Sequence, residues 1–284
     1  MRAPQAGLPF TDSDEQIRAW LDDVSIPTLL AACVHMSGDV SILDGPVVPQ
    51  GAMLNEIQGY LTEEEKAAAR ELALGVIRDY RDRGCPEPAP LSPEVVHRMM
   101  RFVVGADVAD EYVPMMLEEL GLDGVDVRAS TPSRSVPEDF SVVIIGCGMS
   151  GLLAAIRLGQ AGIPYVVVEK NAGPGGTWFE NTYPGARVDV GNHFYSYSFE
   201  PSDDWTEYFA RQPELLAYFT AVMHKHGVAQ HVRWSTEVVG ATWDEDTATW
   251  DVELADGERL TARAVISAVG QLSRPQVPDV PGTF

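Results

Sequence analysis

Four residues near the middle of the chain have the spacing best suited to chemistry, namely Gly146, Gly148, Gly151 and Glu169. The glycines form a GxGxxG motif: the first permits a tight turn, the second lets the backbone approach a pyrophosphate, and the third lets helix and strand pack closely. A helix that starts at such a turn offers free N–H groups to phosphate. The carboxylate of Glu169 can accept hydrogen bonds from a ribose diol and would repel a 2′-phosphate. The motif therefore predicts a site for FAD or NAD rather than for NADP.

The segments around the motif have the pattern that such a site needs. A β-branched run over 141–145 predicts a buried strand, apolar residues over 152–158 predict a helix, and 165–168 predicts a second buried strand that ends at Glu169. The alternative is a glycine-rich turn in an unrelated α/β fold, but the complete strand–turn–helix–strand unit with its terminal acid favours dinucleotide binding. Cys147 lies in the turn without a nearby second cysteine, so we expect a small buried side chain rather than a redox thiol.

A second glycine-rich segment follows soon after Glu169. It reads GPGGTWFENTYPGARVDV over 173–190, and the aromatic run NHFYSYSF follows over 192–199. Aromatic side chains beside glycines suit the binding of a flat ring system. The alternative is a surface loop with incidental aromatic residues.

These two segments resemble class B flavin monooxygenases, specifically Baeyer–Villiger monooxygenases, through the run GGTWxxNxYPGxxxD followed by YSYSF. The resemblance covers residues 140–284. The Asn192–His193 pair and a helical extension of this length are most similar to the 4-hydroxyacetophenone monooxygenase group.

The resemblance implies a cofactor role for each matching position. The residues expected to hold the FAD pyrophosphate are Gly146, Gly148, Ser150 and Gly151, while Glu169 would hold the adenosine ribose. Those expected along the flavin side are Gly176, Thr177 and Trp178. Tyr195 matches a tyrosine near FAD, and the backbone at Val238 would contact adenine. Asp189 is the expected catalytic carboxylate near the flavin ring, paired with an arginine that the family carries outside this segment. Without the resemblance, Asp189 would be an ordinary loop acid.

The complete enzyme implied by this resemblance would use FAD, NADPH and O2 to convert a ketone, in this subgroup an aryl ketone, into an ester. The family's FxGxxxHxxxW fingerprint should begin near Phe284, and its second Rossmann motif, for NADPH, is not found in the sequence. We therefore expect an N-terminal portion that is inactive by itself. The alternatives are an N- or S-oxygenating flavin monooxygenase, disfavoured by the PGAR run over 184–187 with Asp189, and a non-catalytic flavin-binding or interaction protein.

The predicted fold class is α/β, a Rossmann-type FAD-binding domain over 140–284. Alternating segments over 238–243 and 249–254, a turn at Asp256–Gly257 and a returning strand over 264–269 resemble the β-meander inserted in the glutathione-reductase type of FAD-binding fold.

Residues 1–122 predict an all-helical N-terminal domain, joined by a polar linker over 123–139. Ile17, Trp20, Leu21 and Val24 recur at helical spacing, and Thr62 with Glu65 predicts a capping box before a stripe that includes Leu72. Because this region carries no catalytic motif, we expect it to form a homodimer contact.

Composition limits the possible partners. The chain has 20 Lys and Arg against 42 Asp and Glu, a net charge of -22, which argues against nucleic acid and against an anionic membrane surface. An odd count of three cysteines, without metal-ligand spacing, predicts a cytoplasmic protein with no metal site. Small molecules, a ketone and O2, are the partners that remain.

Overall fold

The computed structural model describes residues 9–51, 58–120, 136–137, 139–192, 194–202, 204–272 and 282. The chain divides into two compact units, Met1–Asp126 (unit 1) and Val127–Phe284 (unit 2), each described by itself below. Most of the expected linker over 123–139, together with His193 and Phe284, lies outside the described residues.

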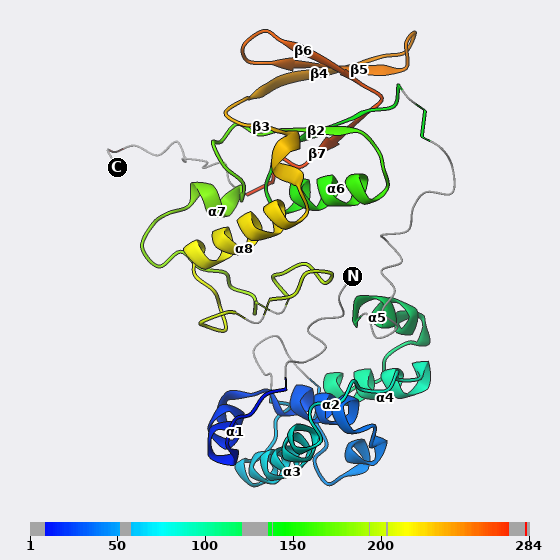
Figure 1. Cartoon of the computed structure of the whole chain (residues 1–284), viewed down its shortest axis with the longest axis vertical. Coiled ribbons are helices and arrows are strands. Elements are labelled where there is room, and N and C mark those ends of the chain that lie inside the picture. The colour runs from blue at the N-terminus through cyan, green and yellow to red at the C-terminus, as the bar shows by residue number, and fades with distance from the viewer. Residues whose placement is uncertain are drawn as a thin grey trace. The chain divides into compact units, whose positions relative to one another are not determined.

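The regular elements of unit 1 are all helices among its described residues (Figure 1). Its α-helices are α1 (Asp14–Trp20), α2 (Ile26–Ser37), α3 (Glu63–Asp82), α4 (Pro93–Val104) and α5 (Val113–Leu120), with 3-10 turns η1 (Leu21–Asp23), η2 (Val40–Asp44) and η3 (Asp110–Tyr112). The predicted capping box at the start of α3 is confirmed: the Glu65 N–H donates to the Thr62 hydroxyl, and the Thr62 N–H donates to the Glu65 carboxylate at 2.7 Å.

Two apolar residues at helical spacing in unit 1 are exposed. Trp20, the last residue of α1, is 58% exposed, whereas Ile17 and Leu21 are buried. Leu72 is 41% exposed, whereas Ala69 and Ala73 of the same helix are buried in a cluster that includes residues of α2. Helical spacing therefore indicated the helices but not the exposure of these two side chains.

Unit 2 is built on a parallel sheet with strand order β3-β2-β1-β7 (Figure 1). The strands are β1 (Val142–Ile145), β2 (Tyr165–Val168), β3 (Val232–Arg233) and β7 (Ala264–Ser267), and Val142 aligns with both Tyr165 and Ala264. Helix α6 (Met149–Gln160) joins β1 to β2, and α8 (Gln212–Lys225) with η5 (Val228–His231) precedes β3. The predicted strand–turn–helix–strand unit is confirmed.

The parallel sheet is covered on both faces, which explains why its strands are almost entirely apolar. Val142 and Ile144 pack with α6 and α8 on one face, in the same cluster as Leu152 and Phe219. On the other face, Val143 packs against an antiparallel meander. Its strands are β4 (Val238–Asp244), β5 (Thr249–Leu254) and β6 (Arg259–Ala262). Unit 2 thus has three layers, helices, parallel sheet and meander, and the GxGxxG turn lies at the carboxyl end of β1.

Candidate cofactor site

The turn between β1 and α6 is shaped by glycines that no other residue can replace. Gly146 has φ +100°, and a Cβ there would lie 2.6 Å from the carbonyl oxygen of Ala268, just after β7. A Cβ on Gly151 would lie 1.9 Å from the carbonyl oxygen of Gly146. The first glycine therefore makes the turn, and the third lets α6 pack against it.

Glu169, at the end of β2, is directed at this turn and is only 3% exposed. Its Oε2 accepts the N–H of Cys147 at 2.6 Å, and its Oε1 accepts the N–H of Asn171 at 2.8 Å. A carboxylate has about four lone-pair positions, so the two bonds leave capacity for ribose hydroxyls.

The second glycine-rich segment lies directly beside the first. The Gly175 N–H donates to the Cys147 carbonyl at 3.0 Å. Gly176 has φ +53°, and a Cβ there would lie 3.1 Å from the Cα of Gly148. Two backbones meet here without side chains between them. We call the pair of turns, 146–151 and 173–178, the glycine cradle.

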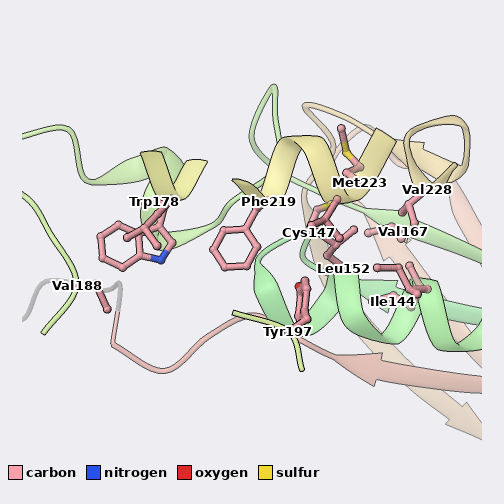
Figure 2. Packing of buried hydrophobic residues seen from close by; sticks show 14 of the residues in the cluster. Ile144, Cys147, Leu152, Val167, Trp178, Val188, Tyr197, Phe219, Met223 and Val228 are labelled. Atoms are coloured by element: carbon pink, nitrogen blue, oxygen red, sulfur yellow. The ribbon is translucent and has the colours of Figure 1, made fainter. Parts of the chain in front are cut away.

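Trp178 and Tyr195 meet next to the glycine cradle. Trp178 lies in the short helix α7 (Thr177–Glu180) and is 8% exposed. Its Nε1 donates to the Tyr195 hydroxyl at 3.0 Å, and the two rings stand perpendicular. The Trp178 carbonyl accepts from the side-chain amide of Gln212, which ties α7 to α8. Figure 2 shows Trp178 at one end of the buried cluster that also holds Tyr197 and Phe219.

Asp189 is exposed between two anchored neighbours. The Val188 N–H donates to the Ala210 carbonyl at 3.1 Å. Asn192, only 2% exposed, donates from its side chain to the Glu207 carbonyl at 2.6 Å and accepts the Ala210 N–H at 2.8 Å. The Asp189 carboxylate itself has no hydrogen-bond or ion-pair partner among the described residues, so no such bond ties it to the rest of the loop.

The remaining site residues lie around the same edge of the sheet. Ser150 and Thr177 are exposed, in the first turns of α6 and α7. Val238 begins β4, two residues after Thr236, whose N–H donates to the Glu169 carbonyl at 2.9 Å. The structure therefore joins the two glycine turns to each other, Glu169 to the first turn, and Tyr195 to Trp178 in the second.

The sequence did not single out Gln212 or Tyr197 at this site, and it pointed to Asn192 only through the resemblance, without a structural role. Asn192 anchors the Asp189 loop, Gln212 joins α7 to α8, and the Tyr197 hydroxyl donates to the Met149 carbonyl at 2.5 Å. Burial raises the pKa of the Tyr197 phenol. Each of these contacts joins residues far apart in sequence, and no local pattern indicates it, although Tyr197 stands in the YSYSF run.

Cys147 is fully buried, as expected. Burial, and then the nearby Glu169 carboxylate, raise the pKa of its thiol to about 12. Throughout the described ranges, no group of three or more His, Cys, Asp or Glu side chains is placed to hold a metal ion. None of the helices described for this chain is long and apolar enough to cross a membrane.

Residues 144–212 match the family model described as an NAD(P)-binding Rossmann-like domain. Unit 2 therefore contains a Rossmann-like dinucleotide-binding domain of mixed α/β structure, as the motif predicts.

Three relatives extend this result. The chain is 34% identical over 267 residues to an uncharacterized monooxygenase, y4iD, of Sinorhizobium fredii (strain NBRC 101917 / NGR234), a match covering 92% of this chain and 40% of the relative. It is 43% identical to a Baeyer–Villiger monooxygenase of Streptomyces coelicolor (strain ATCC BAA-471 / A3(2) / M145), over 52% of this chain and 29% of the relative. Phenazine N-monooxygenase PhzNO1 of Lysobacter antibioticus is 36% identical, over 50% of this chain and 27% of the relative.

The homologues of this chain are Baeyer–Villiger monooxygenases and related flavin monooxygenases, which confirms the resemblance at the level of the family. The chain spans 40%, 29% and 27% of these three relatives. A match over 92% of the chain must include most of unit 1, so the helical unit is shared with one monooxygenase relative.

Proposed function

We propose that unit 2 binds FAD in an extended form across the glycine cradle. The observation that carries the proposal is the contact between the two glycine turns at Gly148 and Gly176, with the buried Glu169 carboxylate directed at the first turn. The absence of a Cβ at both positions leaves room for a pyrophosphate against the backbone, and the α6 N-terminus faces that space. Relatives named as FAD-binding monooxygenases support FAD over NAD.

Within this proposal each site residue has a role. The turn residues Gly146, Gly148, Ser150 and Gly151 hold the pyrophosphate, and Glu169 holds the adenosine ribose. Gly176, Thr177 and Trp178 line the flavin side, Tyr195 lies near FAD, and the Val238 backbone lies against adenine. The meander on the outer face of the sheet supports the more specific assignment to the glutathione-reductase type of FAD-binding fold.

We further propose that the chain is the FAD-binding part of an FAD- and NADPH-dependent Baeyer–Villiger monooxygenase that oxidises ketones, aryl ketones by subgroup, to esters with O2. FAD, when bound, supplies the redox chemistry with NADPH and O2. The chain's own contribution is to hold the cofactor and to keep the Asp189 carboxylate exposed near it. An arginine from a further domain pairs with Asp189 there, and the pair sets the charge at the reaction centre.

The visible absorption spectrum of the purified chain, before and after denaturation, tests FAD binding. We expect a yellow protein that releases FAD, and no ketone-dependent NADPH oxidation by the 284-residue chain alone. A folded chain, verified by circular dichroism, that neither contains FAD nor takes it up would refute the proposal.

N-oxygenation is a second candidate function, because phenazine N-monooxygenase PhzNO1 is among the relatives. The two functions differ in the substrate that stimulates NADPH oxidation. The test joins the chain to the remaining C-terminal part of one of these monooxygenase relatives. Stimulation by ketones with formation of an ester supports the first candidate, whereas stimulation by nitrogen heterocycles with formation of an N-oxide supports the second.

For unit 1 we propose a homodimer contact, motivated by a helical unit that carries no catalytic motif. Sedimentation of the chain with and without residues 1–122 tests this proposal, and a monomer in both cases contradicts it.

We also propose a cytoplasmic location, which the three free thiols of the chain support.

A further inference from the structure

Three successive carbonyl groups at the start of α6 accept hydrogen bonds. The Cys147 carbonyl accepts from the Gly175 N–H at 3.0 Å, and the Gly148 carbonyl accepts from the Leu152 N–H of α6 at 2.9 Å. The next carbonyl along, that of Met149, accepts from the Tyr197 hydroxyl at 2.5 Å. This third donor is a side chain, and it adds to the helical bonding of the Met149 carbonyl, since Met149 is the first residue of α6.

A hydrogen bond to a backbone carbonyl also sets the orientation of the N–H group in the same peptide unit. The peptide unit is planar and trans, so the C=O of one residue and the N–H of the next point in opposite directions. The three bonds therefore orient the N–H groups of Gly148, Met149 and Ser150. Among the residues that the structure describes, none of these N–H groups has an acceptor. They are the donors that the helix start offers to phosphate.

Tyr197 is itself rigidly placed. It is 6% exposed and packs against the rings of Phe199 and Phe219. Its N–H donates to the Tyr218 hydroxyl at 2.9 Å, and that hydroxyl in turn donates to the Glu200 carbonyl at 2.7 Å. In Figure 2 the Tyr197 side chain lies in the buried cluster beside Leu152 and Cys147. The hydroxyl therefore reaches Met149 from a fixed support.

We propose that Tyr197 is a positioning residue for the pyrophosphate: its hydroxyl holds the Met149–Ser150 peptide unit so that the Ser150 N–H faces the phosphate. The inference rests on the proposed binding of FAD. It assigns to the second tyrosine of the YSYSF run a role in phosphate affinity, exerted through the backbone and without contact with the cofactor.

The test uses the full chain with Tyr197→Phe, which removes the hydroxyl and keeps the ring. Tyr165→Phe is the matched control, because it removes a hydroxyl packed against the same cluster that makes no hydrogen bond to Tyr197 or to α6 among the described residues. For each protein, calorimetric titration measures the dissociation constants of ADP and adenosine, and flavin fluorescence measures that of FAD. ADP carries the pyrophosphate without the flavin, and adenosine carries neither.

Tyr197→Phe should raise the dissociation constants of ADP and FAD about fivefold, the usual effect of one lost hydrogen bond. The dissociation constant of adenosine should stay unchanged. Tyr165→Phe should keep the wild-type ratio of ADP to adenosine affinity even where it lowers Tm. Wild-type ADP affinity in Tyr197→Phe would overturn the inference.

Hydrogen exchange of the ligand-free proteins separates this inference from the proposed function. Tyr197→Phe should speed exchange of the Leu152 amide, the hydrogen-bonded amide in the first turn of α6, and Tyr165→Phe should not. Unchanged exchange in that turn overturns the positioning role. A wild-type chain that binds neither ADP nor FAD overturns the proposed function, and the assigned role in phosphate affinity with it.

Discussion

The carboxylate of Glu169 accepts the backbone N–H of Cys147 at 2.6 Å, so the acid at the end of β2 is bonded to the turn at the end of β1. The bond spans two neighbouring strands whose residues align in register, Ile145 opposite Val168. Glu169 is thus part of the turn's structure as well as the proposed ribose ligand.

Glu169→Gln should therefore reduce both stability and FAD affinity. An amide presents one oxygen where the carboxylate presents two, so it cannot accept from both Cys147 and Asn171 without turning an NH2 group toward a donor. Leaving a buried N–H without its acceptor costs about 1–3 kcal/mol. Chemical denaturation with and without FAD measures the two effects. Equal stability of the variant and the wild type in the absence of FAD would contradict the structural role.

Alanine substitutions at two glycines of the turn should have different consequences. Gly151→Ala should prevent folding of unit 2, because its Cβ would lie 1.9 Å from the Gly146 carbonyl oxygen. In Gly148→Ala the nearest atom would be 3.6 Å away, so the chain should fold but bind FAD more weakly, since the methyl group occupies the cradle. Circular dichroism and FAD content distinguish the two. Gly75→Ala in α3, with open space around its Cβ, is the control and should leave FAD binding unchanged.

Substitutions at Asp189 and Asn192 should differ in their effect on stability, because we propose a functional role for the first residue and a structural role for the second. Asp189→Asn removes an exposed charge without a partner in the described residues, so its stability should stay within about 0.5 kcal/mol of the wild type. Asn192→Ala removes the buried amide that holds Glu207 and Ala210, and should cost about 1–3 kcal/mol. Thermal unfolding compares them. A large loss of stability in Asp189→Asn would show that the carboxylate supports the fold.

Only one of the three cysteines should react with a thiol reagent in the native protein. Burial raises the pKa of both Cys33 and Cys147 to about 12, so neither forms a thiolate at neutral pH. Cys85, after α3, is half-buried. Spectrophotometric titration should count one thiol in the native protein and three after unfolding, and Cys85→Ser should abolish the native reaction. Rapid native modification of Cys147 would contradict the packing of the turn.

The ion pair of Asp139 with Arg263 should contribute to stability at neutral pH and not in acid. The Arg263 hydrogen bond lowers the pKa of Asp139 below its ordinary value of 3.8. Because the folded protein keeps this carboxylate charged to lower pH than the unfolded chain does, the stabilisation is present above pH 3.8 and disappears as the pH falls through the lowered value. Asp139→Asn should thus lower Tm slightly at pH 7 and leave it unchanged at the acid end. An equal effect at both pH values would exclude the charge as the cause.

The sequence predicted the parts of unit 2 that depend on local pattern. The strand before Gly146, the helix after it and the acid at the end of the next strand lie within one short stretch, where β-branched runs and glycine spacing determine the backbone. The turn at Asp256–Gly257 was predictable for the same reason, and Gly257 has φ +87° there.

Contacts between distant segments could not be predicted in this way. Tyr197 and Met149 are 48 positions apart, and nothing in either segment indicates that a hydroxyl meets a carbonyl. The amide of Asn192 looks like any polar loop residue until residues 207–210 are packed around it. Apolar spacing likewise indicated the helices that carry Trp20 and Leu72, but it does not say which turn of a helix meets its neighbour, and both side chains are exposed.

The backbone carbonyl that lies against Gly146 belongs to Ala268, which follows β7, a strand at the edge of the parallel sheet. Ala268 reaches that place only after the meander has formed and β7 has paired with β1. During synthesis, residues 146–151 therefore emerge early, but one side of the turn stays open until β7 and Ala268 have been made. If the turn binds a dinucleotide as we propose, loading is a late event, and the bound dinucleotide favours the closed sheet over an unpaired β7.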